Sequence, residues 1–134
     1  MGDQENRATL ERHWTASEAG DYQVEHDLYQ DDAVLEYPQS GERIRGRPSI
    51  QAARACHPAK RHFRINRILG GGDLWVTEYV ITYDGKPLNT VSIMEFHEGK
   101  VTRETQYFSE PFEPPAYRAG LVEHVGEHRL AGSR

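Results

Sequence analysis

The chain has 134 residues, which suits a single domain with a hydrophobic core of its own. Its 16 Lys and Arg against 21 Asp and Glu give a formal net charge of -5, which argues against a nucleic-acid partner. No apolar run approaches the length of a membrane span and the N-terminus lacks a signal-peptide core, so we expect a cytoplasmic protein without a membrane partner. Cys56 is the only cysteine, which excludes an intrachain disulfide.

The N-terminal segment predicts two helices. Over residues 4–19 a helical repeat places four side chains on one face, namely Leu10, His13, Trp14 and Ser17. Gly20 can end this helix, because glycine readily adopts the left-handed conformation of a C-cap. Asp21 can cap a second helix, which is expected to run to about Tyr29.

A strand, a turn and a third helix are expected next. Residues 33–37 are typical of a strand, and Pro38 stops it because proline cannot donate to a sheet ladder. Residues 39–46, which include two arginines, are interpreted as a solvated turn. Pro48 suits the first turn of a helix over residues 49–56.

The remainder predicts an antiparallel meander followed by a C-terminal extension. Four segments have the composition of strands, namely residues 62–69, 73–83, 87–97 and 101–108. Residues 115–125 are expected to form a short helix, and residues 126–134 a frayed tail. Helices gathered before an antiparallel meander indicate an α+β fold, in which a curved sheet and three helices of the N-terminal half can enclose a pocket.

Three sequence segments resemble the nuclear transport factor 2-like superfamily, which includes ketosteroid isomerases and SnoaL-like polyketide cyclases. They are GDYQVEHDLYQDDAVLEYP at residues 20–38, GRPSI at residues 46–50, and IMEFHEGKVTRETQYFSEPF at residues 93–112. The resemblance spans about residues 5–120 and implies one SnoaL-like domain over residues 1–134. It also implies a cone-shaped, cystatin-like α+β fold with a deep cavity, and a homodimer commonly formed through the outer sheet face.

The same resemblance implies where catalytic groups would lie. In ketosteroid isomerases the pocket holds a tyrosine of the first helix and an aspartic acid of the sheet, and the base is the aspartate before the strand-ending proline. Here these positions are occupied by His13, Ser92 and Tyr37. A neutral tyrosine is not a base at pH 7, so dedicated ketosteroid isomerase activity is not expected.

Three residues are therefore the candidates for catalysis. His13 titrates near neutral pH and is a candidate acid or base, with a buried structural histidine as the alternative. Tyr37 is a candidate hydrogen-bond donor to a carbonyl or oxyanion, with ordinary strand packing as the alternative. Glu104 in an apolar cavity would have a raised pKa and could exchange protons, unless it is a surface residue paired with Arg103 or Lys100.

Candidate ligand-binding residues follow from the alternation of side chains along the strands. Residues two apart share a face, so Glu104 is grouped with Gln106 and Phe108. Alternation alone does not say which face points inward, and the family alignment favours the faces that contain Ser92 and Tyr79. With one residue from the first helix, the candidates are Trp14, Trp75, Tyr79, Ser92, Met94, Gln106 and Phe108.

The sequence thus predicts a protein that binds a small, mostly apolar organic molecule in its cavity. If it is an enzyme, the expected reaction is that of an isomerase, cyclase or hydratase without cofactor or metal, in which His13 and Glu104 exchange protons. The alternatives are a noncatalytic carrier or sensor of small ligands, and a protein-interaction domain.

Overall fold

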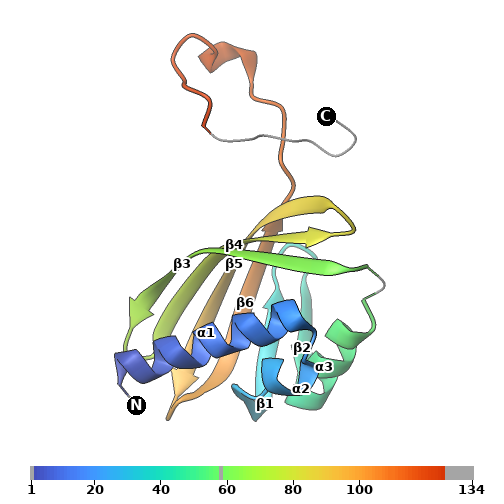
Figure 1. Ribbon diagram of the computed structural model, residues 1–134, viewed down its shortest axis with the longest axis vertical. Helices are drawn as coiled ribbons and strands as arrows, with labels where there is room; N and C mark the ends of the chain where they lie inside the picture. The colour runs from blue at the N-terminus through green and yellow to red at the C-terminus, as the bar shows by residue number, and fades with distance from the viewer. Residues whose placement is uncertain (1, 58, 126–134) are drawn as a thin grey trace.

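The computed structural model describes residues 2–57 and 59–125, and within them three α-helices pack against one mixed sheet of six strands (Figure 1). The predicted tail of residues 126–134 lies outside the described part. None of the helices in the described part is long and apolar enough to cross a membrane.

Helix α1 (Asp3–Ala19) lies across the concave side of the sheet (Figure 1). It buries the predicted face, because Leu10, His13, Trp14 and Ser17 are all at most 5% exposed. The helix ends at Gly20, whose φ of 76° is the left-handed conformation that glycine adopts most readily. The prediction for this helix is confirmed.

Helix α2 (Tyr22–Glu25) is a single turn and is shorter than predicted. The side chain of Asp21 caps it as expected, by accepting a hydrogen bond of 3.2 Å from the backbone N–H of Val24. Strand β1 (Tyr29–Tyr37) then begins four residues earlier than predicted. The earlier start depends on a tertiary contact, because Tyr29 pairs with Val101 of a strand far along the chain.

Two elements frame the turn that follows β1. Strand β2 (Glu42–Arg45) pairs antiparallel with β1, so the interpretation of this segment as a solvated turn was wrong. Arg43 contributes to this pairing through an ion pair of 2.7 Å with Glu36 on β1. Helix α3 (Arg47–Ala55) follows as predicted and buries Ile50.

The four predicted C-terminal strands are present and form an antiparallel meander. They are β3 (Arg61–Gly71), β4 (Leu74–Tyr83), β5 (Lys86–His97) and β6 (Lys100–Ser109). The strand order is β2-β1-β6-β5-β4-β3, in which β1 runs parallel to β6. The sheet is curved and open, with β2 and β3 at its two edges, and it matches the predicted α+β fold class (Figure 1).

The core fills the space between the helices and the concave face of the sheet. Burial identifies the inward faces of β4, β5 and β6, because Tyr79, Ser92 and Glu104 are at most 1% exposed. On the opposite face of β5, the side chain of Glu95 is 51% exposed. The choice of inner faces made from the sequence is therefore confirmed.

The C-terminal extension differs from its prediction. Instead of a helix over residues 115–125, the described chain forms one 3-10 turn at Ala116–Arg118. A helix of this length is marginal in water unless a face packs against another surface, and this segment stands off the body of the molecule (Figure 1).

Candidate functional site

A partly enclosed cavity of about 70 Å³ lies between the helices and the concave face of the sheet. Aromatic side chains make up much of its wall, namely Trp14, Tyr37, Phe63, Tyr83 and Phe108. Five polar or charged side chains also line it, namely Glu25, Arg54, His57, Arg61 and Gln106. Established ligand sites are generally larger, about 300–1,000 Å³, so this conformation holds only a small molecule or fragment.

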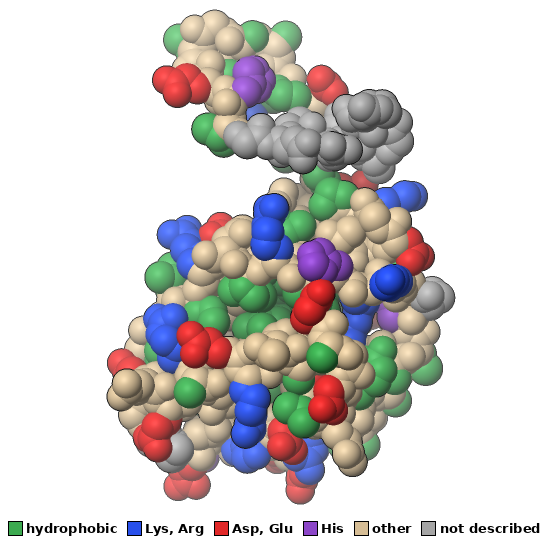
Figure 2. Space-filling model, viewed as in Figure 1, with side chains coloured by type: hydrophobic (Ala, Val, Ile, Leu, Met, Phe, Trp, Pro, Cys, Tyr) green, Lys and Arg blue, Asp and Glu red, His purple; other side chains and the backbone are tan. Residues whose placement is uncertain are grey.

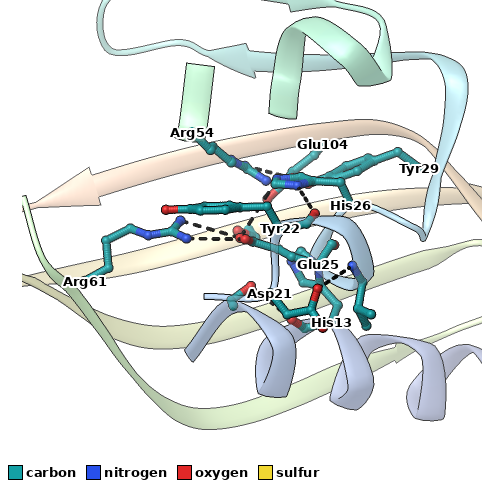
Figure 3. Close-up of polar contacts among 12 residues, drawn as sticks. His13, Asp21, Tyr22, Glu25, His26, Tyr29, Arg54, Arg61 and Glu104 are labelled. Carbon is teal, nitrogen blue, oxygen red and sulfur yellow. Dashed lines mark hydrogen bonds and ion pairs between the residues drawn. The ribbon is translucent and has the colours of Figure 1, made fainter. Parts of the chain in front are cut away.

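A buried ion pair joins Arg54, which lines the cavity, to Glu104, which does not (Figure 3). Their side chains are 11% and 0% exposed, and Arg54 Nη2 lies 3.2 Å from Glu104 Oε1. Arg54 also donates to the Tyr29 hydroxyl at 2.7 Å and to the Gln106 side-chain carbonyl at 3.2 Å. The Tyr29 hydroxyl in turn donates to Glu104. These extra hydrogen bonds offset the desolvation of the two charges.

The environment of Glu104 holds it ionised. Burial alone would raise the pKa of this carboxyl, but the charge of Arg54 and the hydrogen bond from Tyr29 outweigh burial and hold the pKa below its ordinary value. The prediction of a raised pKa for Glu104 was therefore wrong. It assumed an apolar cavity, whereas α3 brings a guanidinium into contact with the carboxylate.

Three of the predicted ligand-binding residues form one hydrogen-bonded cluster, in which Gln106 lines the cavity and the other two lie beneath it. The Gln106 amide donates to the Tyr79 hydroxyl at 2.6 Å and to the Ser92 hydroxyl at 3.2 Å. The two hydroxyls lie 2.9 Å apart. Gln106 thus joins this cluster to Arg54, which fixes the guanidinium from a second side.

A second ion pair, between Glu25 of α2 and Arg61 of β3, lies in the cavity wall (Figure 3). Its two nitrogen–oxygen distances are 3.3 and 3.5 Å, and the side chains are 2% and 10% exposed. Burial would raise the pKa of Glu25, but the neighbouring positive charges, Arg61 foremost and Arg54 further off, together outweigh burial and lower it. The Arg61 guanidinium also lies 5.3 Å from the centres of the Tyr22 and Phe63 rings.

His13 is buried beneath the cavity and is not part of its wall. Its Nδ1 lies 2.5 Å from the backbone carbonyl of Glu25, so Nδ1 carries the proton and donates it. Burial lowers the pKa of His13 to about 4, which keeps the ring neutral at pH 7. This geometry favours the alternative of a structural histidine, which connects α1 to α2.

The other predicted site residues divide between the wall and the layer beneath it. Trp14, Tyr37, Gln106 and Phe108 line the cavity, and Met94 is buried in the core. Trp75 is buried and does not line the cavity, and its indole N–H donates to the Gly72 carbonyl at the β3–β4 turn. Its place in a ligand site stays a prediction.

The sequence reasoning missed Arg54, Glu25 and Arg61. Arg54 had a usable signal, because it lies four residues after the apolar Ile50 on α3 and so shares its buried face. Glu25 and Arg61 had no comparable signal, since they meet only through the packing of α2 against the sheet. Among the described residues, no group of three or more His, Cys, Asp or Glu side chains could hold a metal ion.

Comparison with known proteins gives a consistent family. Residues 10–104 match the SnoaL-like domain family. An NTF2-like protein of unknown function from Burkholderia xenovorans is 55% identical, with a TM-score of 0.87 over 94% of this chain and 99% of that one. A search of curated proteins finds no match.

Two further solved structures extend the comparison. A putative ketosteroid isomerase from Kribbella flavida is 27% identical, with a TM-score of 0.87 over 97% of this chain and 98% of that one. An LEH-like epoxide hydrolase from M. tuberculosis is 21% identical, with a TM-score of 0.66 over 79% of this chain and 84% of that one, and it shows the fold alone.

Proposed function

This chain belongs to the SnoaL-like family of the nuclear transport factor 2-like superfamily, and we propose that it binds a small, mostly apolar carbonyl compound and moves a proton on it without a cofactor. One observation carries the proposal: a carboxylate, Glu25, and a guanidinium, Arg54, line the same aromatic cavity. A carbonyl compound needs one group of each kind for proton transfer at the neighbouring carbon.

The binding part of the proposal rests on the cavity wall. Trp14, Phe63 and Phe108 offer apolar surface to a hydrocarbon body, and Arg54 and Tyr37 offer donors to a carbonyl oxygen. The Tyr37 and Phe108 rings lie 6.0 Å apart and are only half-buried. We expect them to turn outward for a ligand larger than the present volume.

In the catalytic part of the proposal, Glu25 is the base. Its lowered pKa keeps it ionised at neutral pH, so it can take a proton from the carbon next to the carbonyl. Arg54 stabilises the resulting oxyanion, and Glu25 returns the proton to the same carbon or to a conjugated one. Glu104 and Gln106 position Arg54, while His13 positions α2 through the Glu25 carbonyl.

The identity of the relatives supports an isomerase-type reaction only in general terms. The Kribbella protein is described as a putative ketosteroid isomerase. In the present chain Tyr37 stands before Pro38, and the cavity is small for a steroid. We therefore propose a smaller substrate. The sequence-based pair of His13 and Glu104 stays a prediction, with Glu25 as the base better placed to touch a ligand.

Deuterium exchange separates an enzyme from a carrier. Cyclohexanone and acetophenone would be incubated with the protein in D₂O, with α-proton exchange followed by NMR and binding by Trp fluorescence. We expect protein-dependent exchange that Glu25→Gln abolishes. Glu78→Gln is the matched control, because Glu78 is paired with Arg67 on the outer face of the sheet. Binding without exchange would support the noncatalytic carrier. The absence of both binding and exchange would overturn the proposal.

A further inference from the structure

The C-terminal segment of residues 110–125, which we call the arm, presents a row of exposed apolar side chains. Tyr117, Leu121 and Val125 are 82%, 87% and 83% exposed. Their spacing of four residues would place them on one face of a helix. The backbone hydrogen bonds found for residues 115–121 join residues of that segment to one another. A group of large, exposed apolar side chains is typical of a surface that binds another protein.

Prolines hold the arm away from the body of its own chain (Figure 1). Pro111, Pro114 and Pro115 each fix φ near −65°, and each also keeps the preceding residue extended. A proline-rich segment such as residues 111–115 is semi-rigid, so it opposes a sharp return of the rest of the arm onto its own sheet. The apolar row is therefore presented outward, toward a different molecule.

The body of the molecule has an apolar groove between α1 and β3. Its volume is about 470 Å³, and Phe63, Ile65 and Ile68 of β3 line one side of it. Figure 2 shows hydrophobic side chains gathered in the hollow above α1, with little cover in a single chain. Acidic residues of α1, Glu11 and Glu18, stand at its edge.

We propose that the arm of one chain docks in the α1–β3 groove of a second copy, and that the exchange is reciprocal in a homodimer. The row of Tyr117, Leu121 and Val125 would meet the apolar groove, while Arg118 would face the acidic residues at its edge. Docking would also supply the packing surface that a short helix requires. This explains why the sequence predicts a helix here and the single chain has only one turn.

Docking of the arm would also bear on the cavity. Trp14 and Phe63 line both the groove and the cavity, so the two spaces share one wall. An arm bound in the groove would pack against Trp14 and Phe63 and restrict the movement of these side chains. This last step rests on the proposed ligand site, whereas the docking itself does not.

Sedimentation with matched leucine variants tests the docking. The full chain is expected to sediment as a dimer at micromolar concentration, and Leu121→Asp is expected to weaken the dimer by about tenfold or more. Leu69→Asp is the control, because Leu69 is 49% exposed at the far end of β3 and lies outside the groove. A monomeric wild-type chain, or a Leu121→Asp dimer as tight as wild type, would overturn the proposal.

Cysteine trapping then locates the contact. In a Cys56→Ser background, one chain carries Leu121→Cys and a second, of different mass, carries Thr15→Cys at the groove edge. We expect a disulfide-linked mixed dimer under mild oxidation. Replacing Thr15→Cys by Glu95→Cys, on the outer sheet face, is expected to abolish the link. Preferential linkage to Glu95→Cys would favour a dimer formed through the sheet face and would overturn the proposal. A chain that carries both Leu121→Cys and Thr15→Cys tests the other alternative. A disulfide within that single chain would show that the arm folds back onto its own groove, which would also overturn the proposal.

Discussion

The buried ion pairs Arg54–Glu104 and Glu25–Arg61 are similar in exposure but differ in how firmly they are held. Arg54 and Glu104 share Tyr29 as a common hydrogen-bonding partner, and Gln106 fixes the guanidinium from the side. Glu25 and Arg61 meet through two long contacts of 3.3 and 3.5 Å. In the proposed reaction, the first pair would hold the Arg54 guanidinium in a fixed position, and the second would offer the Glu25 carboxylate to a ligand.

The largest expected effect comes from breaking the firmly held pair. Arg54→Met would leave the Glu104 carboxylate buried without its counter-ion, which is expected to lower the free energy of unfolding by about 3–5 kcal/mol. Urea denaturation followed by circular dichroism measures this. A loss below about 1 kcal/mol would mean that the pair is not the fixed element described above.

The next effect concerns His13, which connects the looser pair to α1. Its pKa is about 4 in the folded protein and near 6.5 when unfolded, so between these values the unfolded chain binds a proton that the folded chain does not. The free energy of unfolding should therefore fall as the pH drops from about 6.5 to 4, by up to about 3 kcal/mol from this residue.

His13→Asn provides the comparison for that pH dependence. The variant is expected to be less stable at pH 7 but to lose less further stability between pH 6.5 and 4, measured as urea midpoints across the range. The lowered pKa values of Glu25 and Glu104 act separately. Their contribution is present above the ordinary carboxyl pKa and is lost at still lower pH. An unchanged slope in the variant would contradict the assignment.

Loosening the second pair is expected to have a smaller effect on stability and a larger one on chemistry. Glu25→Gln keeps the size of the side chain but removes its charge, at a cost of about 1–2 kcal/mol. Exchange of ketone protons, if present in the wild type, should disappear in this variant. A variant that loses more stability than Arg54→Met would reverse the ranking of the two pairs.

The smallest effect is expected at the exposed pair of Arg67 and Glu78. Their side chains are 62% and 43% exposed, so solvent screens their attraction. Arg67→Met should change the free energy of unfolding by no more than about 0.5 kcal/mol in the same urea assay. This variant calibrates the effect of replacing an arginine by a methionine.

Local periodicity was enough to predict the inner surface of the fold. The alternation that grouped Glu104 with Gln106 holds because both lie on a regular strand with one face in the core. The buried face of α1, which contains His13 and Trp14, was predictable because its buried side chains recur with the period of a helix. Which side chains are buried can be predicted from such patterns, because burial follows the side-chain period of each helix or strand.

What surrounds those residues could not be predicted in the same way. The pKa of Glu104 depends on Arg54, fifty residues earlier, which only the packing of α3 brings within 3.2 Å. The start of β1 at Tyr29 likewise depends on Val101. The helix predicted over residues 115–125 failed for the opposite reason, because its local pattern is helical but one chain alone gives it nothing to pack against.

The parallel pairing of β1 with β6 has a consequence for synthesis on the ribosome. Tyr29 pairs with Val101, so the N-terminal helices and β1 emerge long before the strand that completes their core. Contacts between such distant parts of the chain slow folding, because a large loop must close before they form. A nascent chain that ends before β6 therefore exposes the apolar side of β1, and these unfinished chains are the ones we expect chaperones to bind.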